Sequence, residues 1–84
     1  MKKILIYSKD ICPYCTKAKN LLQRKGVEFE EIKITSDELK QEMIAKSNGR
    51  MTVPQIFIGD LHVGGCDDLY ALESAGKLND LLEK

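Results

Sequence analysis

The stretch that decides the fold is Ile4-Leu5-Ile6-Tyr7 followed, after a short loop, by Cys12-Pro13-Tyr14-Cys15. The run Lys3–Tyr7 is mostly apolar and predicts a strand that is buried on both faces. From Cys12 onward a helix is predicted up to Lys25, with Gly26 at its end. The apolar side chains that recur there with helical spacing are Cys15, Ala18, Leu21 and Leu22.

The place of Cys12 at the start of this helix predicts its chemistry. With Cys12 as the N-cap residue, Pro13 takes the first helical position, where its missing N–H costs nothing. The Cys12 sulfur then faces unpaired backbone N–H groups and the positive end of the helix dipole, and both favour a thiolate. Cys15 lies one turn further on the same face and within disulfide reach. We therefore expect Cys12 to be the nucleophile and Cys15 the resolving thiol.

Two other interpretations of the cysteine pair stay open at this point. A zinc site would need two further ligands, and the remaining candidates, Cys66 and His62, are not spaced as a second ligand pair. A structural pair of buried cysteines is the other alternative, although Pro13 and Tyr14 between them indicate a shaped surface. The position between strand and helix favours redox chemistry, and no metal site is predicted.

Length, composition and charge describe a single globular domain over residues 1–84. A net charge of zero argues against non-specific nucleic-acid binding. Met1-Lys2-Lys3 precedes only four consecutive apolar residues, too few for a secretory signal or a membrane span. Three cysteines do not form a disulfide scaffold, so a reducing compartment, the cytoplasm, is expected. A monomer is the default expectation.

Positive charge is concentrated near the cysteines in the sequence. Residues 1–25 contain seven basic residues and one acidic residue, a balance of +6, and the remainder therefore carries −6. This distribution favours a thiolate and an anionic substrate. Lys9, three residues before Cys12, is the candidate to contact such a substrate, whereas Lys17, Arg24 and Lys25 are expected on a solvated helix face.

The remaining chain alternates between further strands and helices. Val27–Ile34 is predicted to be a strand parallel to the first, with a small irregularity at Glu30-Glu31. Ser36 is expected to cap a helix that ends at Asn48-Gly49. Thr52–Ile58 and Leu61–Val63 flank a Gly-Asp turn and predict an antiparallel hairpin. The predicted inward residues are Leu39, Met43 and Ile44 on the first of these helices, Leu69, Leu72 and Ala75 on a helix opened by Cys66, and Leu78, Leu81 and Leu82 in a final turn.

The order β-α-β-α-β-β-α with Cys-x-x-Cys after the first strand is the α/β thioredoxin-fold pattern, a four-stranded mixed sheet with helices on both faces. Three motifs make a narrower match: Cys12-Pro13-Tyr14-Cys15, Thr52-Val53-Pro54 and Gly64-Gly65-Cys66-Asp67-Asp68. Together they resemble the dithiol glutaredoxins, most closely the bacterial glutaredoxin 3 type, over essentially the whole chain.

The second and third motifs have chemistry of their own. Gly64-Gly65 lets a ligand approach the backbone, and the helix that follows offers N–H groups to a carboxylate. Asp67 can accept from an ammonium group, so the motif suits a zwitterionic amino-acid end, while Asp68 is expected mainly to cap the helix. The resemblance implies a cis Val53–Pro54 bond that leaves the Val53 backbone free to pair with a peptide.

The resemblance also implies that the anionic substrate is glutathione. By analogy Lys9 and Gln41 would meet its glycine carboxylate, Tyr14 would shape the groove, and the Cys66 backbone would lie against the γ-glutamyl group. The implied glutathione-binding set is Lys9, Tyr14, Gln41, Thr52, Val53, Pro54, Gly65, Cys66 and Asp67, around catalytic Cys12 and Cys15.

The expected function is a glutathione-dependent thiol–disulfide oxidoreductase that reduces protein disulfides and protein–glutathione mixed disulfides. The resemblance implies ribonucleotide reductase or glutathionylated proteins as partners. Two alternatives remain: a thioredoxin-like electron donor recycled by a reductase, and an iron–sulfur carrier with glutathione as co-ligand. Pro13 after the first cysteine disfavours the carrier.

Overall fold

The computed structural model describes residues 2–83, which form one mixed four-stranded sheet in the order β2-β1-β3-β4. The strands are β1 (Ile4–Ser8), β2 (Glu30–Lys33), β3 (Gln55–Ile58) and β4 (Leu61–Gly64). β1 is central, parallel to β2 and antiparallel to β3, and β4 pairs antiparallel with β3. The predicted βαβ unit and hairpin are therefore confirmed.

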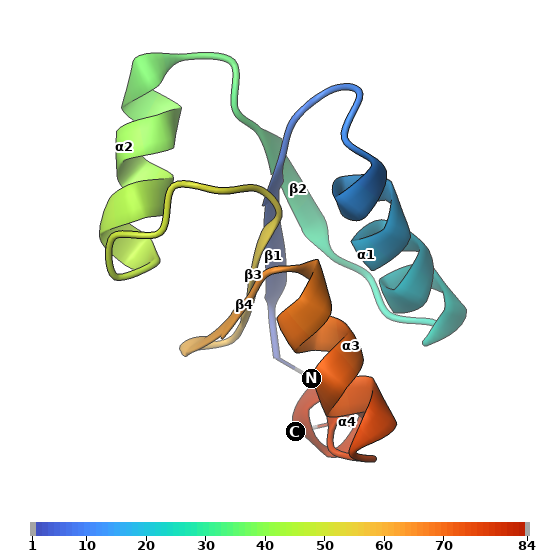
Figure 1. Ribbon diagram of the computed structural model, residues 1–84. Coiled ribbons are helices and arrows are strands. Elements are labelled where there is room, and N and C mark those ends of the chain that lie inside the picture. Colours follow the sequence, from blue (N-terminus) through green and yellow to red (C-terminus); the bar gives the residue numbers. More distant parts are fainter. Residues whose placement is uncertain (1, 84) are drawn as a thin grey trace.

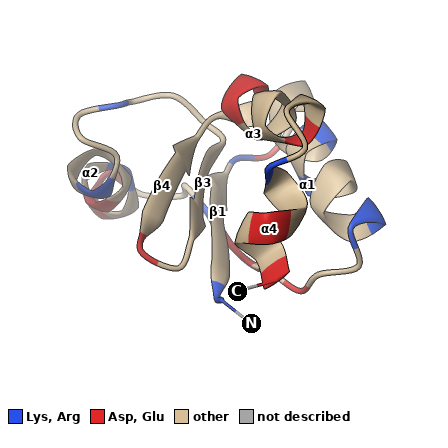
Figure 2. Cartoon of the chain, turned by 90° about the horizontal axis from the view of Figure 1, so that it is seen from below, with Lys and Arg blue, Asp and Glu red and all other residues tan. Residues whose placement is uncertain are grey.

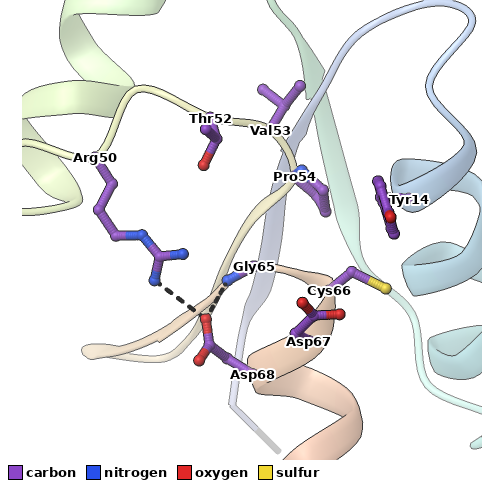
Figure 3. A pocket seen from close by; sticks show the side chains of 9 residues that line it. All are labelled: Tyr14, Arg50, Thr52, Val53, Pro54, Gly65, Cys66, Asp67 and Asp68. Atoms are coloured by element: carbon purple, nitrogen blue, oxygen red, sulfur yellow. Dashed lines mark hydrogen bonds and ion pairs between the residues drawn. The ribbon is translucent and has the colours of Figure 1, made fainter.

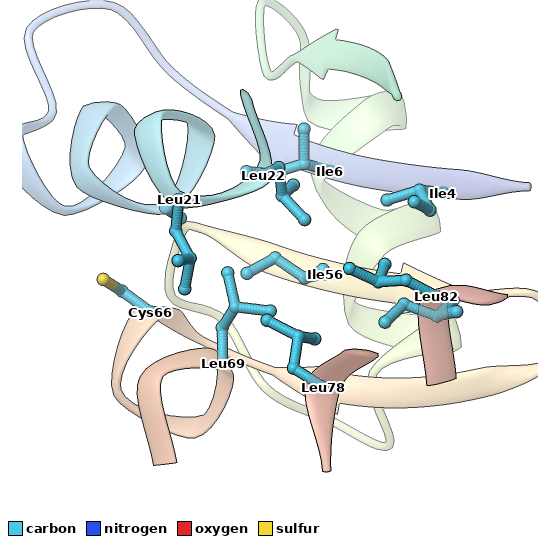
Figure 4. Packing of buried hydrophobic residues seen from close by; sticks show 11 residues of the cluster. Ile4, Ile6, Leu21, Leu22, Ile56, Cys66, Leu69, Leu78 and Leu82 are labelled. Atoms are coloured by element: carbon cyan, nitrogen blue, oxygen red, sulfur yellow. The ribbon is translucent and has the colours of Figure 1, made fainter. Parts of the chain in front are cut away.

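Helices cover both faces of this sheet. They are α1 (Pro13–Arg24), α2 (Asp37–Lys46), α3 (Cys66–Ser74) and α4 (Leu78–Glu83). α2 lies alone on one face, and α1, α3 and α4 lie on the other (Figures 1 and 2). The hydrophobic core fills the three-helix side (Figure 4) and consists of Ile4, Ile6, Ala18, Leu21, Leu22, Ile56, Ile58, Cys66, Leu69, Leu78 and Leu82.

The helix α2 covers the opposite face of the sheet and buries fewer apolar side chains than the three helices on the core side. Ser36 caps this helix as predicted, its hydroxyl accepting from the Leu39 N–H at 3.2 Å. Of the predicted apolar face only Met43 is fully buried. The buried Tyr7 hydroxyl donates to Glu42 at 2.6 Å, which ties α2 to the central strand. Burial and the Glu42 carboxylate raise the Tyr7 pKa, so the phenol stays protonated.

Two predicted details are wrong. The second strand extends only over Glu30–Lys33, which pair with Leu5–Ser8 of β1, and Val27, Glu28 and Ile34 would lie beyond the ends of β1. Val27 and Phe29 still pack against the core from outside the ladder. Ala75 is exposed instead of pointing inward, since α3 ends at Ser74 and Ala75 is its C-cap. Across residues 2–83, no helix is long and apolar enough to cross a membrane.

Candidate active site

The two cysteines of the first motif lie at the N-terminus of α1. Cys12 is the N-cap, Pro13 follows at the first helical position, and the Cys15 N–H donates to the Cys12 sulfur at 3.2 Å. The pair forms a disulfide, with Cα atoms 5.2 Å apart. Cys15 is 1 % exposed and Cys12 8 %, so the first cysteine is the more accessible of the two. The predicted arrangement of helix cap and disulfide is confirmed.

The Thr52-Val53-Pro54 segment runs beside this helix end. Its Val53–Pro54 peptide bond is cis, as predicted. Among residues 2–83, neither the N–H nor the carbonyl of Val53 forms a hydrogen bond. Val53 therefore offers one donor and one acceptor to an incoming extended chain.

A buried glutamine and a half-buried histidine hold this segment in place. Gln55 is fully buried, and its side-chain Nε2 donates to the Thr52 carbonyl at 3.0 Å. Its Oε1 is 2.7 Å from Nε2 of His62 on the adjacent strand. Because Oε1 can only accept, the His62 Nε2 carries the proton that is donated. Burial and nearby Arg50 lower the His62 pKa, which keeps the imidazole neutral.

The third motif turns from β4 into α3 with Asp68 as its central contact (Figure 3). The Asp68 carboxylate accepts from the Gly65 N–H at 2.9 Å and from Arg50 at 3.1 Å, and these contacts lower its pKa. Gly64 has φ +116°, and a side chain there would collide with this carboxylate. Asp68 is thus the expected cap, whereas Asp67 is exposed and forms no hydrogen bond or ion pair within residues 2–83.

Two cavities flank the Cys12 end of α1. We define the α3 cavity, of about 160 Å³, by its lining residues Tyr14, Arg50, Thr52, Val53, Pro54, Gly65, Cys66, Asp67 and Asp68. We define the α2 cavity, of about 500 Å³, by Lys9, Ile11, Cys12, Pro13, Tyr14, Ile34, Lys40, Met43, Met51, Thr52 and Val53. Tyr14, Thr52 and Val53 line both, so the two cavities adjoin along the cis-proline segment.

The structure brings most of the predicted site residues to these cavities. Seven line the α3 cavity, and Lys9 joins Cys12 on the α2 cavity. Gln41 is exposed on α2 and lines neither cavity, so its role stays a prediction. The Cys66 thiol is buried at 4 % exposure, and this burial raises its pKa. Cys66 therefore lines the site as a poorly ionised thiol.

Sequence reasoning missed part of the α2 cavity. Ile11, Ile34, Lys40 and Met51 line it, and none was singled out as a site residue. The available signal was their position in the sequence: Ile11 directly precedes Cys12, and Met51 directly precedes Thr52. Within residues 2–83, no group of three or more His, Cys, Asp or Glu side chains is arranged to hold a metal ion.

A disulfide-forming Cys-Pro-Tyr-Cys at a helix N-terminus, beside a cis-proline segment on this sheet, defines a thiol–disulfide oxidoreductase of the thioredoxin fold. The Glutaredoxin family model matches residues 4–63. Glutaredoxin 3 of Escherichia coli strain K12 is 53 % identical over 83 residues, which cover 99 % of this chain and 100 % of that protein.

Solved structures agree with the sequence comparison. The solution structure of glutaredoxin from Brucella melitensis is 58 % identical, has a TM-score of 0.86, and is matched over 98 % of this chain and 89 % of that one. The crystal structure of a buckwheat glutaredoxin–glutathione complex has a TM-score of 0.89 at 30 % identity, with coverage of 98 % and 77 %. The chain belongs to the glutaredoxin family.

Proposed function

We propose that this enzyme uses glutathione to reduce protein disulfides and protein–glutathione mixed disulfides, as a monomeric single domain over residues 1–84 in the cytoplasm. The observation that supports the proposal is the α3 cavity, whose lining includes Val53, the first turn of α3 and the exposed Asp67 carboxylate, and which adjoins the α2 cavity lined by Cys12. A buckwheat relative was crystallised as a glutathione complex, which supports the same ligand here.

Each part of this cavity suits one part of glutathione. The N–H groups of the first turn of α3 have no intrahelical acceptors and suit the γ-glutamyl carboxylate. Asp67 suits the γ-glutamyl ammonium group. Val53 pairs with the backbone of the cysteine residue. Lys9, exposed on the adjoining cavity, suits the glycine carboxylate.

The chemistry follows two routes. In the first, the Cys12 thiolate attacks the glutathione sulfur of a protein–glutathione mixed disulfide and releases the protein thiol; a second glutathione then regenerates Cys12 as glutathione disulfide leaves. In the second, Cys12 forms a mixed disulfide with a protein and Cys15 resolves it, leaving the Cys12–Cys15 disulfide for glutathione to reduce. Only the second route needs Cys15. Ribonucleotide reductase and glutathionylated proteins are the proposed partners.

The test is glutathione-coupled reduction of a glutathionylated peptide by the parent, Cys12→Ser and Cys15→Ser. We expect Cys12→Ser to be inactive and Cys15→Ser to retain activity, because only Cys12 is needed for the first route. Asp67→Asn is expected to raise KM for the glutathionylated peptide by about tenfold, the usual cost of losing a charge-assisted hydrogen bond.

Two further measurements distinguish the alternatives. If the parent turns over only with a thioredoxin-type reductase, the protein is an electron donor recycled by that reductase and not by glutathione. Visible absorbance after anaerobic purification would support the iron–sulfur carrier.

A further inference from the structure

Exposed apolar side chains gather around the α2 cavity. Large exposed apolar residues are few in the described chain, and three of them line this cavity: Ile11 at 98 % exposure, Met51 at 67 % and Tyr14 at 61 %. Behind them lie half-buried Ile34 and buried Met43. Cys12 lines the same cavity, so the site cysteine and this apolar surface face one space.

Ile11 is the most informative of these residues. Its backbone has φ +52°, a left-handed conformation that β-branched residues rarely adopt. Its side chain is almost wholly exposed, so packing within the chain does not account for an isoleucine there. A side chain held outward next to the nucleophile is positioned to contact a bound partner.

The charges at this cavity have one sign. Lys9 and Lys40 line it, both are exposed, and neither forms an ion pair within residues 2–83. Of the residues that the structure describes, none of those lining the cavity is acidic. A complementary partner therefore presents an apolar side chain together with a carboxylate.

We propose that the α2 cavity binds the polypeptide of protein disulfide substrates, selecting segments with a bulky apolar residue and an acidic residue next to the attacked cysteine. This inference rests on the proposed function and names its substrate class. Met43 and Met51 are flexible and polarisable, which suits a pocket that accepts side chains of different shape. The γ-glutamyl end of glutathione is assigned to the α3 cavity with its exposed Asp67 carboxylate, so glutathione and the polypeptide share only the Lys9 side of the α2 cavity and bind in turn.

Such a substrate is reduced by two successive thiol–disulfide exchanges, and glutathione then restores the enzyme. The Cys12 thiolate attacks one sulfur of the substrate disulfide, forms the Cys12–substrate bond and releases the other substrate sulfur as a thiolate. Cys15, as thiolate, then attacks the Cys12 sulfur, and the second substrate thiolate leaves and takes up a proton. Two glutathione molecules reduce the Cys12–Cys15 disulfide and leave as glutathione disulfide.

The experiment compares three synthetic peptides, each with an internal disulfide. The first has Leu and Asp beside one cysteine, the second replaces Leu by Ser, and the third replaces Asp by Lys. Cysteine–glutathione mixed disulfide is the reference substrate, with glutathione and glutathione reductase regenerating the enzyme. For the parent we expect kcat/KM for the Leu–Asp peptide to exceed that for the Ser peptide by about tenfold, typical of a small apolar pocket.

Substitutions at the cavity are expected to remove these preferences. Ile11→Asn, which the left-handed backbone tolerates, and Met51→Ser should each bring the Leu-over-Ser ratio to about twofold or less. Lys40→Glu should invert the preference for Asp over Lys. Leu61→Asn is the matched control, because Leu61 is an exposed apolar residue that does not line either site cavity, and it should keep the parent's ratios.

The outcomes separate this inference from the proposed function. Equal rates for the three peptides with the parent, or unchanged ratios in all cavity variants, overturn the substrate selection while the reference substrate still turns over. Failure of the parent to reduce cysteine–glutathione mixed disulfide with glutathione overturns the proposed function itself.

Discussion

At the residue scale, two thiols of this small protein have opposite surroundings. The Cys12 sulfur caps α1 and accepts the Cys15 N–H at 3.2 Å, contacts that stabilise a thiolate. The Cys66 sulfur lies in the core, where burial raises its pKa despite the nearby cation of Lys17. The same residue type is therefore found here both at a helix terminus that favours the thiolate and as a thiol packed in the apolar core.

This contrast predicts the order of alkylation. In the reduced protein at neutral pH, iodoacetamide should modify Cys12 well before Cys66, because a raised pKa leaves Cys66 mostly as thiol. In a Cys12→Ser/Cys15→Ser variant, labelling of Cys66 should accelerate only as pH rises above the ordinary thiol range of about 8.5. Peptide mass mapping over time measures both rates; rapid neutral labelling of Cys66 would contradict the assignment.

The left-handed backbone at Ile11 predicts an effect on stability. Ile11→Gly should raise the free energy of unfolding by up to about 1 kcal/mol, because glycine avoids the Cβ clash at φ +52°. Thermal unfolding of the reduced protein would show this as a Tm higher by a few degrees. Ile11→Ala is the control: it removes the apolar side chain but keeps the Cβ, so no comparable gain is expected.

At the element scale, α3 begins with two neighbouring carboxylates that do different work. Asp68 accepts from Gly65 and Arg50, while Asp67 is exposed and forms no such contact within the described chain. The depressed pKa of Asp68 means that its stabilising contribution is present above the ordinary range of an aspartate and is lost as pH falls through the folded value.

Asp68→Asn is therefore expected to lower the free energy of unfolding at pH 7 by about 0.5–1 kcal/mol, a modest value since the carboxylate is half exposed. The difference from the parent should shrink as the pH is lowered below about 3.9. Urea unfolding of both proteins at pH 7 and at a pH below about 3.9 measures this difference in the free energy of unfolding. Asp67→Asn, one residue earlier, should change stability less and glutathione binding more; the reverse pattern would exchange the two roles.

Helices and strands could be told apart from the sequence because their hydrophobic periodicities are strong. The ends of β2 and α3 depend on tertiary contacts and could not be predicted. The second strand is cut short by the length of β1, which cannot be seen within residues 27–34. Likewise Ala75 follows the helical spacing of α3, yet the helix ends before it. Local pattern fixes the kind of element, and tertiary pairing fixes where it stops.

At the scale of the whole molecule, the positive charge of residues 1–25 does not form one patch (Figure 2). Lys3 pairs with Glu30, Lys19 with Glu31 and Lys25 with Glu73. The opposite charges of the later chain thus neutralise much of the excess that the sequence shows. Lys9 lines the α2 cavity together with Cys12, and within residues 2–83 no carboxylate forms an ion pair with it.

This distribution predicts a local salt effect. Raising ionic strength from low to about 0.15 M should lower kcat/KM for cysteine–glutathione mixed disulfide several-fold, since screening weakens attraction of the anionic substrate. Lys9→Gln should have a lower kcat/KM and a flatter salt dependence. Lys3→Gln is the control, as Lys3 is paired with Glu30 away from both site cavities. Equal slopes for the two variants would remove Lys9 from substrate attraction.

Site residues that belong to a sequence motif could be predicted, whereas those that only the fold brings together could not. Cys12, Cys15, Pro54 and Asp67 stand in recognisable motifs. The α2 cavity instead combines Ile11, Ile34, Met43 and Met51 from distant parts of the chain, and their proximity follows only from the packing of α2 across the sheet. Ile11 and Met51 adjoin motif residues in the sequence, but no short-range pattern places Ile34 and Met43 beside them.

The burial of Cys15 has a kinetic consequence. Because Cys12 lines the cavity and Cys15 is closed off, electrons enter and leave the disulfide through the same sulfur. Reductant and oxidised substrate must then take turns, and no complex that holds both at the reacting atom forms. Double-displacement kinetics are expected, with parallel double-reciprocal plots when the two reactants are varied. Intersecting plots would mean that both reactants bind at the same time, which would require that Cys15 is reached independently of Cys12.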